Sequence, residues 1–147
     1  MIRRLIHLYW RFSRGLTLGV RGMVIDRDGR IFLIKHSYMP GWYLPGGGVE
    51  VGETVLEALT RELMEEGNIE IGACEFFALY FNPRDSARDH VALYVIRDFV
   101  QTSPPKPNSE IIAHGFFARD ALPPDITPAT RLRIAEVMDG VARPERW

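Results

Sequence analysis

Residues 47–69 read GGVEVGETVLEALTRELMEEGNI, and this stretch decides the fold. It joins a glycine-rich loop to a helix-forming segment that carries Glu62, Glu65 and Glu66. Because an α-helix turns roughly 100° per residue, positions i, i+3 and i+4 project from one side of it. Three carboxylates gathered there repel one another unless a cation lies between them, and Mg²⁺ prefers such oxygen ligands. A solvated acidic face has the same pattern, so the rest of the stretch must distinguish the two.

The spacing of this stretch resembles the Nudix box, G-x5-E-x7-R-E-U-x-E-E-x-G-U, in which U is an aliphatic residue. The matching residues are Gly47, Glu53, Arg61, Glu62, Leu63, Glu65, Glu66 and Ile69. Asn68 stands where the pattern has its last glycine. That glycine ends the helix in a left-handed conformation, which asparagine tolerates better than most residues do. The chain therefore resembles a Nudix hydrolase, and the departure at Asn68 concerns the end of the helix and leaves the carboxylates in place.

The resemblance implies a metal site in the box. By position, the carboxylates of Glu62, Glu65 and Glu66 and the backbone of Gly47 are expected to hold Mg²⁺ or Mn²⁺ against a diphosphate. An anionic diphosphate would be repelled by carboxylates alone, so a bridging cation also makes physical sense. The glycines of the loop allow a close backbone approach, and a sharp turn from strand to helix would require them as well.

The resemblance also implies catalytic roles, which it assigns to Glu65, Glu66, Arg61 and Glu110. Arg61 is expected to orient carboxylates through its planar guanidinium group, and Glu53 is expected to bind Arg61 or the positive end of the helix. Nudix enzymes often activate water with a glutamate of the box or of a later loop. Glu110, at the end of a proline-rich loop, resembles that later glutamate, with an exposed residue at a strand start as the alternative.

Substrate-binding residues are less clearly indicated. Aromatic side chains near the box that could stack on a base, or belong to the core, are Trp42, Tyr43 and Tyr80. Side chains that could neutralise phosphates are Lys35, His36, Arg84, Arg88 and His90. For the two histidines, a structural role with satisfied hydrogen bonds is the preferred interpretation.

Composition places the chain among ordinary globular proteins. Its 147 residues suit one domain, residues 1–147, and its net charge of -1 predicts no general attraction to DNA or to anionic surfaces. Cys74 is the single cysteine, so an internal disulfide is excluded and a reducing cytoplasm fits best. No stretch has the length of a transmembrane helix.

The N-terminal segment, residues 1–16, reads MIRRLIHLYWRFSRGL and is basic and amphipathic. Such a helix can lie on a membrane surface, and it resembles an organelle-targeting segment because it has arginines and no acidic residue. We expect it instead to pack on its own domain or on a partner subunit of a homodimer.

The order of elements predicts an α/β protein. Strands are expected at 19–26, 31–36, 69–81, 90–100 and 110–118. Strands 19–26 and 31–36 are expected to form a hairpin around Asp28-Gly29. Helices are expected at 54–66, with Leu56, Leu59 and Leu63 buried, and at 127–141. The resemblance gives the fold class as an α/β/α sandwich of the Nudix type with a mixed β-sheet.

These observations predict a cytoplasmic, Mg²⁺-dependent pyrophosphohydrolase whose partner is a small-molecule nucleotide. Its substrate class is either a (d)NTP or an ADP-ribose-like or sugar nucleotide. One alternative is a Nudix-like module that senses a nucleotide, although such modules usually lose the glutamates that this chain keeps. Another alternative is RNA 5′-end processing, for which only the basic N-terminal segment offers a binding track.

Overall fold

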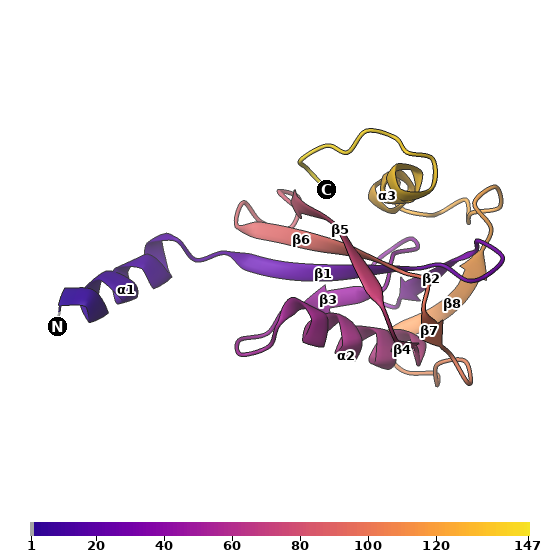
Figure 1. Ribbon diagram of the computed structural model, residues 1–147, viewed down its shortest axis with the longest axis horizontal. Helices are drawn as coiled ribbons and strands as arrows, with labels where there is room; N and C mark the ends of the chain where they lie inside the picture. Colours follow the sequence, from indigo (N-terminus) through magenta and orange to yellow (C-terminus); the bar gives the residue numbers. More distant parts are fainter. Residues whose placement is uncertain (1) are drawn as a thin grey trace.

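A four-stranded mixed sheet forms the centre of the molecule (Figure 1). The computed structural model describes residues 2–147. The strand order is β3-β1-β6-β5, with bounds β1 Thr17–Val24, β3 Gly46–Gly48, β5 Cys74–Phe81 and β6 Asp89–Ile96. β1 runs parallel to β6 and antiparallel to β3, and β5 runs antiparallel to β6. The expected mixed sheet is therefore confirmed.

Two helices cover the two faces of this sheet, α2 (Val55–Gly67) and α3 (Pro128–Met138) (Figure 1). Leu59 and Leu63 of α2 pack against β1 in one core cluster, and α3 packs in a second. Leu56 is 45% exposed, so its expected burial was wrong. Ala58 is buried in its place. The α/β/α sandwich is confirmed, with the acidic helix on one side of the sheet.

The expected hairpin of the first two strands was wrong. β2 (Ile31–His36) pairs instead with β8 (Ile111–Phe117), in a separate two-stranded sheet. Only an isolated bridge between Ile25 and Ile31 links β2 to the end of β1. The reason is that a strand has two edges, and those of β1 are already paired with β3 and β6.

Each of the two long predicted strands is broken into two. Residues 70–71 form β4 (Glu70–Ile71) before β5, and residues 99–100 form β7 (Phe99–Val100) after β6. β4 pairs with β7. The break after β4 is held by Asp98, whose carboxylate accepts a hydrogen bond from the backbone N–H of Ala73 at 2.9 Å.

The N-terminal segment forms α1 (Ile2–Ser13), which projects away from the body of the protein (Figure 1). None of its residues is buried. Within residues 2–147 it does not pack on its own domain, so that part of the expectation was wrong, while packing on a partner subunit stays a prediction. In the same range, no helix combines the length and the apolar character that crossing a bilayer requires.

Candidate metal and catalytic site

Local sequence signals determine both ends of the acidic helix α2. At its start, the Thr54 side chain accepts a hydrogen bond from the backbone N–H of Glu57, and the Glu57 carboxylate accepts one from the backbone N–H of Thr54. At its end, Asn68 is left-handed, with φ 50° and ψ 42°. The N–H of Ile69 then donates to the carbonyl of Leu63 at 3.1 Å. The capping box is confirmed, and Asn68 does what the missing glycine would do.

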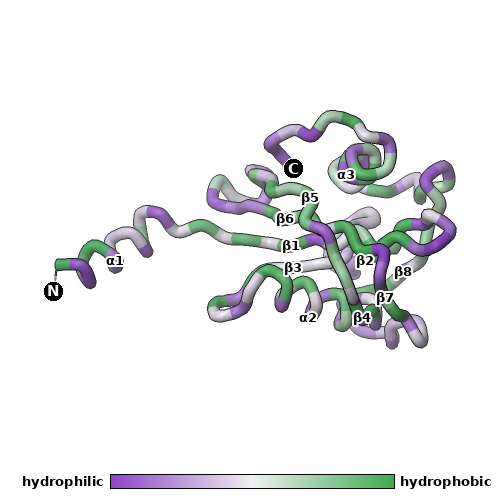
Figure 2. The backbone as a smooth tube through the Cα atoms, in the orientation of Figure 1, coloured by the Kyte–Doolittle hydropathy of each residue, from purple (hydrophilic) through white to green (hydrophobic). Residues whose placement is uncertain are grey.

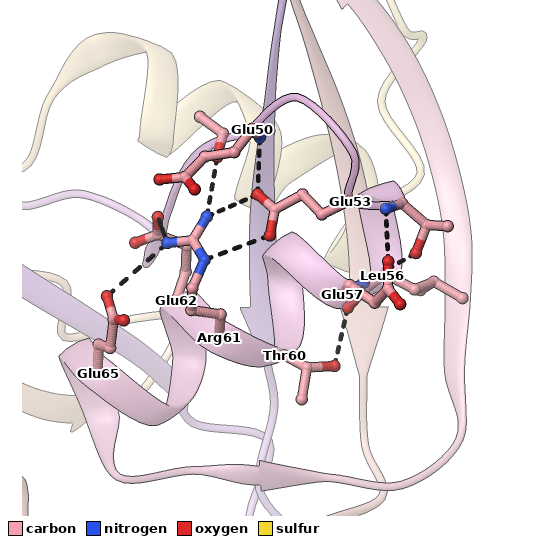
Figure 3. Close-up of polar contacts among 10 residues, drawn as sticks. Glu50, Glu53, Leu56, Glu57, Thr60, Arg61, Glu62 and Glu65 are labelled. Carbon is pink, nitrogen blue, oxygen red and sulfur yellow. Dashed lines mark hydrogen bonds and ion pairs between the residues drawn. The ribbon is translucent and has the colours of Figure 1, made fainter.

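Arg61 connects the acidic residues of the box (Figure 3). Its guanidinium donates to both carboxylate oxygens of Glu53, at 2.8 and 3.3 Å, and to Glu62 at 2.6 Å. Glu65 lies 3.8 Å away, and the carbonyl of Gly48 accepts at 3.2 Å. The bonds from Arg61 hold the pKa of Glu53 below its usual range. The expected pairing of Glu53 with Arg61 is thus present, and Arg61 joins the helix to the glycine strand.

Glu66 is the buried carboxylate of the site, with 9% of its surface exposed. Its Oε2 atom accepts a 2.7 Å hydrogen bond from the backbone N–H of Gly46. Burial raises the pKa of Glu66 to about 7, against the opposing effects of the Gly46 N–H and the charge of Arg21. Near neutral pH this carboxyl group therefore exchanges a proton readily.

Glu62 lies directly against Gly47. A Cβ atom placed on Gly47 would come within 2.4 Å of Glu62 Oε1, so no larger residue fits without moving the carboxylate. The β3 glycines therefore contact two of the expected metal ligands, Glu66 through Gly46 and Glu62 through Gly47. This contact gives a physical reason for glycine at the first position of the box.

The oxygen donors fit a hard divalent cation, although they are not gathered around one point. Among residues 2–147, no group of three or more His, Cys, Asp or Glu side chains is arranged to hold a metal ion. Glu62 is bound by Arg61, Glu66 is bound by Gly46, and the Glu65 side chain is 62% exposed. Like charges without a cation separate and take the nearest donors. Side-chain rotations of Glu62 and Glu65 would be needed for joint coordination.

Two residues near Glu66, His36 and Arg21, take part in the site in ways that the sequence did not predict. His36 is buried with neither ring nitrogen hydrogen-bonded among the described residues, and its Nε2 lies 3.9 Å from Glu66 Oε1. Burial lowers the pKa of His36. The interpretation of His36 as a satisfied structural histidine was wrong. Arg21 on β1 donates to the carbonyls of Leu44 and Gly46, at 3.0 and 2.8 Å, and no motif singled it out.

Glu110 lies at the rim of this site. It is exposed and directly precedes β8, which pairs with β2. Its carbonyl accepts a 2.7 Å hydrogen bond from the N–H of Ser37, the residue after His36. The charge of Glu110 contributes to raising the pKa of Glu66. The pairing of β2 with β8 therefore brings Glu110 near the buried carboxylate, 44 residues away in sequence.

A cavity of about 800 Å³ adjoins the glycine strand. Gly47 and Gly48 form part of its wall, so β3 separates the carboxylates from the cavity. Basic side chains in the lining come from Arg21, Lys35 and Arg84. The buried Asn82 also lines it and donates to the carboxylates of Asp85 and Asp89, at 2.8 and 2.9 Å. This polar group was not found from the sequence, because it depends on how the 82–89 loop folds back.

The other substrate-binding candidates divide between the cavity and the core. Tyr43 lines the cavity, as do Lys35 and Arg84. Tyr80 is fully buried and donates to Glu136 at 2.7 Å, so it belongs to the core and stacking on a base is excluded for it. Trp42 packs edge to face on Phe117. Two further candidates do not line the cavity, Arg88, which donates to the carbonyl of Gly15, and His90.

Comparison with known proteins relates most of the chain to one family. A family model described as the NUDIX domain matches residues 15–137. A MutT-like protein of Streptomyces ambofaciens is 29% identical over 124 residues, which cover 84% of this chain and 78% of that protein. An ADP-ribose pyrophosphatase of Methanocaldococcus jannaschii is 41% identical over 71 residues, which cover 46% of this chain and 42% of that protein. The crystal structure of a MutT NUDIX hydrolase from Burkholderia pseudomallei aligns with a TM-score of 0.71 and 30% identity, covering 83% of this chain and 98% of that one.

Proposed function

This chain belongs to the Nudix hydrolase family, whose members act on phosphorus-containing acid anhydrides, and we propose that it is a Mg²⁺-dependent pyrophosphohydrolase of a nucleotide derivative. One observation carries the proposal. The buried Glu66, the Arg61-bound Glu62 and a cavity of about 800 Å³ all meet at the three-glycine strand β3. None of these carboxylates lines the cavity, and β3 is the edge strand of its sheet, so we infer that a substrate in the cavity reaches the carboxylates around this edge.

The proposed metal ligands are the carboxylates of Glu62, Glu65 and Glu66 with a backbone carbonyl of the glycine strand. When bound, Mg²⁺ would polarise the phosphoryl oxygen and neutralise the diphosphate. Arg61 would hold Glu62 in place, and the Gly46 N–H would fix the direction of the Glu66 carboxylate. Manganese has the same preference for oxygen and would serve in place of magnesium.

The strand register favours Gly46 over Gly47 as the backbone ligand. The N–H groups of Gly22 and Val49 donate to the carbonyls of Pro45 and Leu18 across β1 and β3. Hydrogen-bonded and non-bonded pairs alternate in an antiparallel ladder, so Val20 and Gly47 form a bonded pair between these two. The Gly47 carbonyl is then engaged with β1. The Gly46 carbonyl faces away from β1, where only the Arg21 side chain reaches it.

In the proposed reaction, water attacks one phosphorus of the diphosphate, a new P–O bond forms, and the bond to the bridging oxygen breaks. The leaving phosphate keeps the electron pair, and the proton of the water passes to a carboxylate. Glu110, which lies near Glu66 and is not among the proposed ligands, is the first candidate for that base, and Glu66 is the second. Arg61, through its bonds to Glu53 and Glu62, would hold the ligands in position, and Glu65 would act through the bound cation. The products are a nucleotide and a phosphorylated remainder.

The substrate class is a nucleoside diphosphate linked to a further group. The cavity volume lies in the range of small-molecule sites, which is about 300–1,000 Å³. Arg21, Lys35 and Arg84 in the lining are candidates for phosphate contacts, and Tyr43 supplies an aromatic face. Asp85, Asp89 and Asp125 also line the cavity, and Lys35 is paired with Asp125 at 2.6 Å, so the lining has no excess of positive charge. Both an ADP-ribose-like molecule, the substrate class named for one relative, and a (d)NTP suit this chemistry.

Specific observations count against the two alternative functions, nucleotide sensing and RNA 5′-end processing. A nucleotide-sensing module would not need Glu62, Glu65 and Glu66 together, and all three are present. RNA 5′-end processing would need a basic track toward the site. The fourteen Lys and Arg residues beyond the N-terminal segment are outnumbered by nineteen acidic residues, so the charge balance favours a small molecule over RNA.

The experiment is to measure release of nucleotide and phosphate from a substrate panel with Mg²⁺ and with EDTA. The panel contains NTPs, dNTPs, ADP-ribose, sugar nucleotides, dinucleoside polyphosphates and a 5′-triphosphate RNA. We expect one small-molecule class to be turned over, EDTA to stop the turnover, and Glu66→Gln to lower kcat by at least ~10²-fold. Glu75→Gln, a change on exposed β5 away from the site, is the matched control.

Three results would contradict the proposal. Turnover that persists in EDTA would exclude the metal-dependent mechanism. Turnover of the RNA alone would replace the small-molecule substrate. Nucleotide binding without turnover, unchanged in Glu66→Gln, would identify a sensor.

A further inference from the structure

The N-terminal helix α1 has a face for which the body of the protein provides no partner. All of residues 2–14 are exposed in the structure. Ile2, Leu5 and Phe12 are 73%, 62% and 74% exposed. Figure 2 shows green apolar segments and purple basic segments alternating along this helix, as expected where two faces wind around it. Such large apolar side chains exposed together usually mark a binding surface.

The two faces of α1 are completely separated. With roughly 100° per residue, all the basic side chains of residues 2–14 fall in an arc of about 100°. These are Arg3, Arg4, His7, Arg11 and Arg14. The large apolar side chains span about 200° of the rest of the circumference, and the segment has no acidic residue. The helix is therefore cationic on one side and apolar on the other.

Trp10 stands at the edge of the apolar face. Trp10 packs edge to face on His7, with ring centroids 5.5 Å apart, and the Arg14 guanidinium lies 5.2 Å from the Trp10 ring. Trp10 thus lies where the apolar and basic faces meet. Tryptophan at such a boundary is typical of segments at the interface between acyl chains and headgroups.

We propose that α1 binds the surface of an anionic lipid bilayer, lying in the plane of the interface with its apolar face in the acyl region. Basic side chains flanking that face would contact anionic headgroups, which gives the charge complementarity. Residues 2–14 carry four of the 18 Lys and Arg residues, three of them in α1, and none of the 19 acidic ones. The rest of the chain has the opposite charge, so attraction to anionic lipid belongs to this helix alone.

A second copy of the chain is a poorer occupant for the apolar face. Outside the N-terminal segment, the exposed large hydrophobic residues are scattered singly or in pairs over loops, α2, β5, β7, β8 and α3. No described element outside α1 presents more than two of them. A protein partner would need a continuous apolar groove to cover an arc of about 200°. The acyl region of a bilayer can cover the same arc without a matching shape.

Membrane binding would place the cavity close to the lipid. Only Arg14, Gly15 and Leu16 connect α1 to β1, a span of at most about 10 Å. Thr17, the first residue of β1, lines the cavity, and Arg88 holds the connection through a 2.9 Å hydrogen bond to the Gly15 carbonyl. The proposed enzyme would therefore work near the bilayer surface.

The test is co-sedimentation of the full-length protein with vesicles of phosphatidylcholine alone or of phosphatidylcholine with one quarter phosphatidylglycerol. We expect binding to the anionic vesicles, weakened by raising the salt from about 0.1 M to 0.5 M. Leu5→Ser with Phe12→Ser should lower the bound fraction on the order of tenfold, as should Arg4→Gln with Arg11→Gln. The control is Val51→Ser with Leu132→Ser, two exposed apolar residues of the body, which should bind like the wild type.

Three results would overturn the proposal. Equal binding to neutral and anionic vesicles would show that charge plays no part. Equal loss of binding in the Val51 and Leu132 control would show that the helix is not the contact. Absence of vesicle binding, together with a dimer in sedimentation velocity that Leu5→Ser with Phe12→Ser dissociates, would identify α1 as an interface between copies.

Discussion

The Oε2 atom of Glu66 accepts a 2.7 Å hydrogen bond from the backbone N–H of Gly46. This bond ties the acidic helix to the edge strand β3, and it compensates in part for burying a carboxylate. The compensation is incomplete, because the pKa of Glu66 still rises to about 7. The buried carboxylate is therefore held in a fixed direction and is costly to ionise without a cation.

The stability of the metal-free protein should depend on pH through Glu66. The carboxyl pKa is about 7 in the folded protein and near 4.5 in the unfolded chain, so the folded state binds the proton more tightly. The stability that the protonated Glu66 contributes is complete below pH 4.5 and is lost as the pH rises through 7, on the order of 3 kcal/mol. His36, whose pKa is lowered by burial, acts in the opposite direction below 6.5.

The measurement is the urea midpoint in EDTA from pH 5 to 8 for wild type and Glu66→Gln. Subtracting the wild-type midpoint from the Glu66→Gln midpoint at each pH isolates the contribution of Glu66. We expect the midpoint of Glu66→Gln to rise relative to that of the wild type as the pH increases. Glu65→Gln is the control, because that side chain is exposed and should follow the wild-type curve. Parallel curves for wild type and Glu66→Gln would contradict the raised pKa.

Gly47→Ala should damage the site while Gly48→Ala should not. A Cβ at Gly47 would come within 2.4 Å of Glu62 Oε1, whereas one at Gly48 meets nothing within 4 Å. Neither residue has a positive φ, so the substitutions differ in contact alone. We expect Gly47→Ala to weaken Mg²⁺ binding and turnover about 10–100-fold, and Gly48→Ala to stay within about threefold of wild type. Calorimetric Mg²⁺ titration and kcat/KM check this, and equal losses in both variants would exclude Glu62 as the affected group.

Arg61→Lys should lower kcat/KM by about 10–100-fold although it keeps the charge. Lysine cannot bind Glu53 and Glu62 together, which Arg61 does through three nitrogen atoms. The pair with Glu53 is partly exposed and screened by solvent, so the free energy of unfolding should change little. Arg131→Lys on the exposed face of α3 is the control. Adding Glu53→Gln to Arg61→Lys should cost little more, since both changes remove the same contact.

Asn68→Ala should destabilise the protein more than Asn68→Gly does. Asn68 has φ 50°, a conformation that costs alanine roughly 1–2 kcal/mol and costs glycine almost nothing. Both variants lose the hydrogen bonds from the Asn68 side chain to Ser103, so the comparison isolates the backbone. Urea denaturation measures the difference, which we expect to be about 1 kcal/mol. Equal stabilities would show that the left-handed conformation does not limit the choice of residue.

Local features of the acidic helix were determined by the sequence alone. Thr54 and Glu57 stand three residues apart, which is sufficient for a capping box, and Asn68 ends the helix as a glycine would. The spacing of the box also predicted the contact between Glu53 and Arg61. These features succeed because each depends on residues within about two helical turns, where backbone geometry sets the distances.

Only the tertiary structure decided which strands pair and which side chains gather around Glu66. The sequence predicted that β2 would return along β1, but both edges of β1 are occupied, and β2 joins β8 about 80 residues later. That pairing brings His36 and Glu110 to the carboxylates, and the β1–β3 register brings Arg21 to Gly46. Hydrophobic periodicity shows that a segment is a strand, whereas its partner depends on competition among all the strands of the folded chain. The catalytic neighbourhood therefore follows from long-range pairing, although the acidic core of the site can be identified from the sequence of residues 47–69.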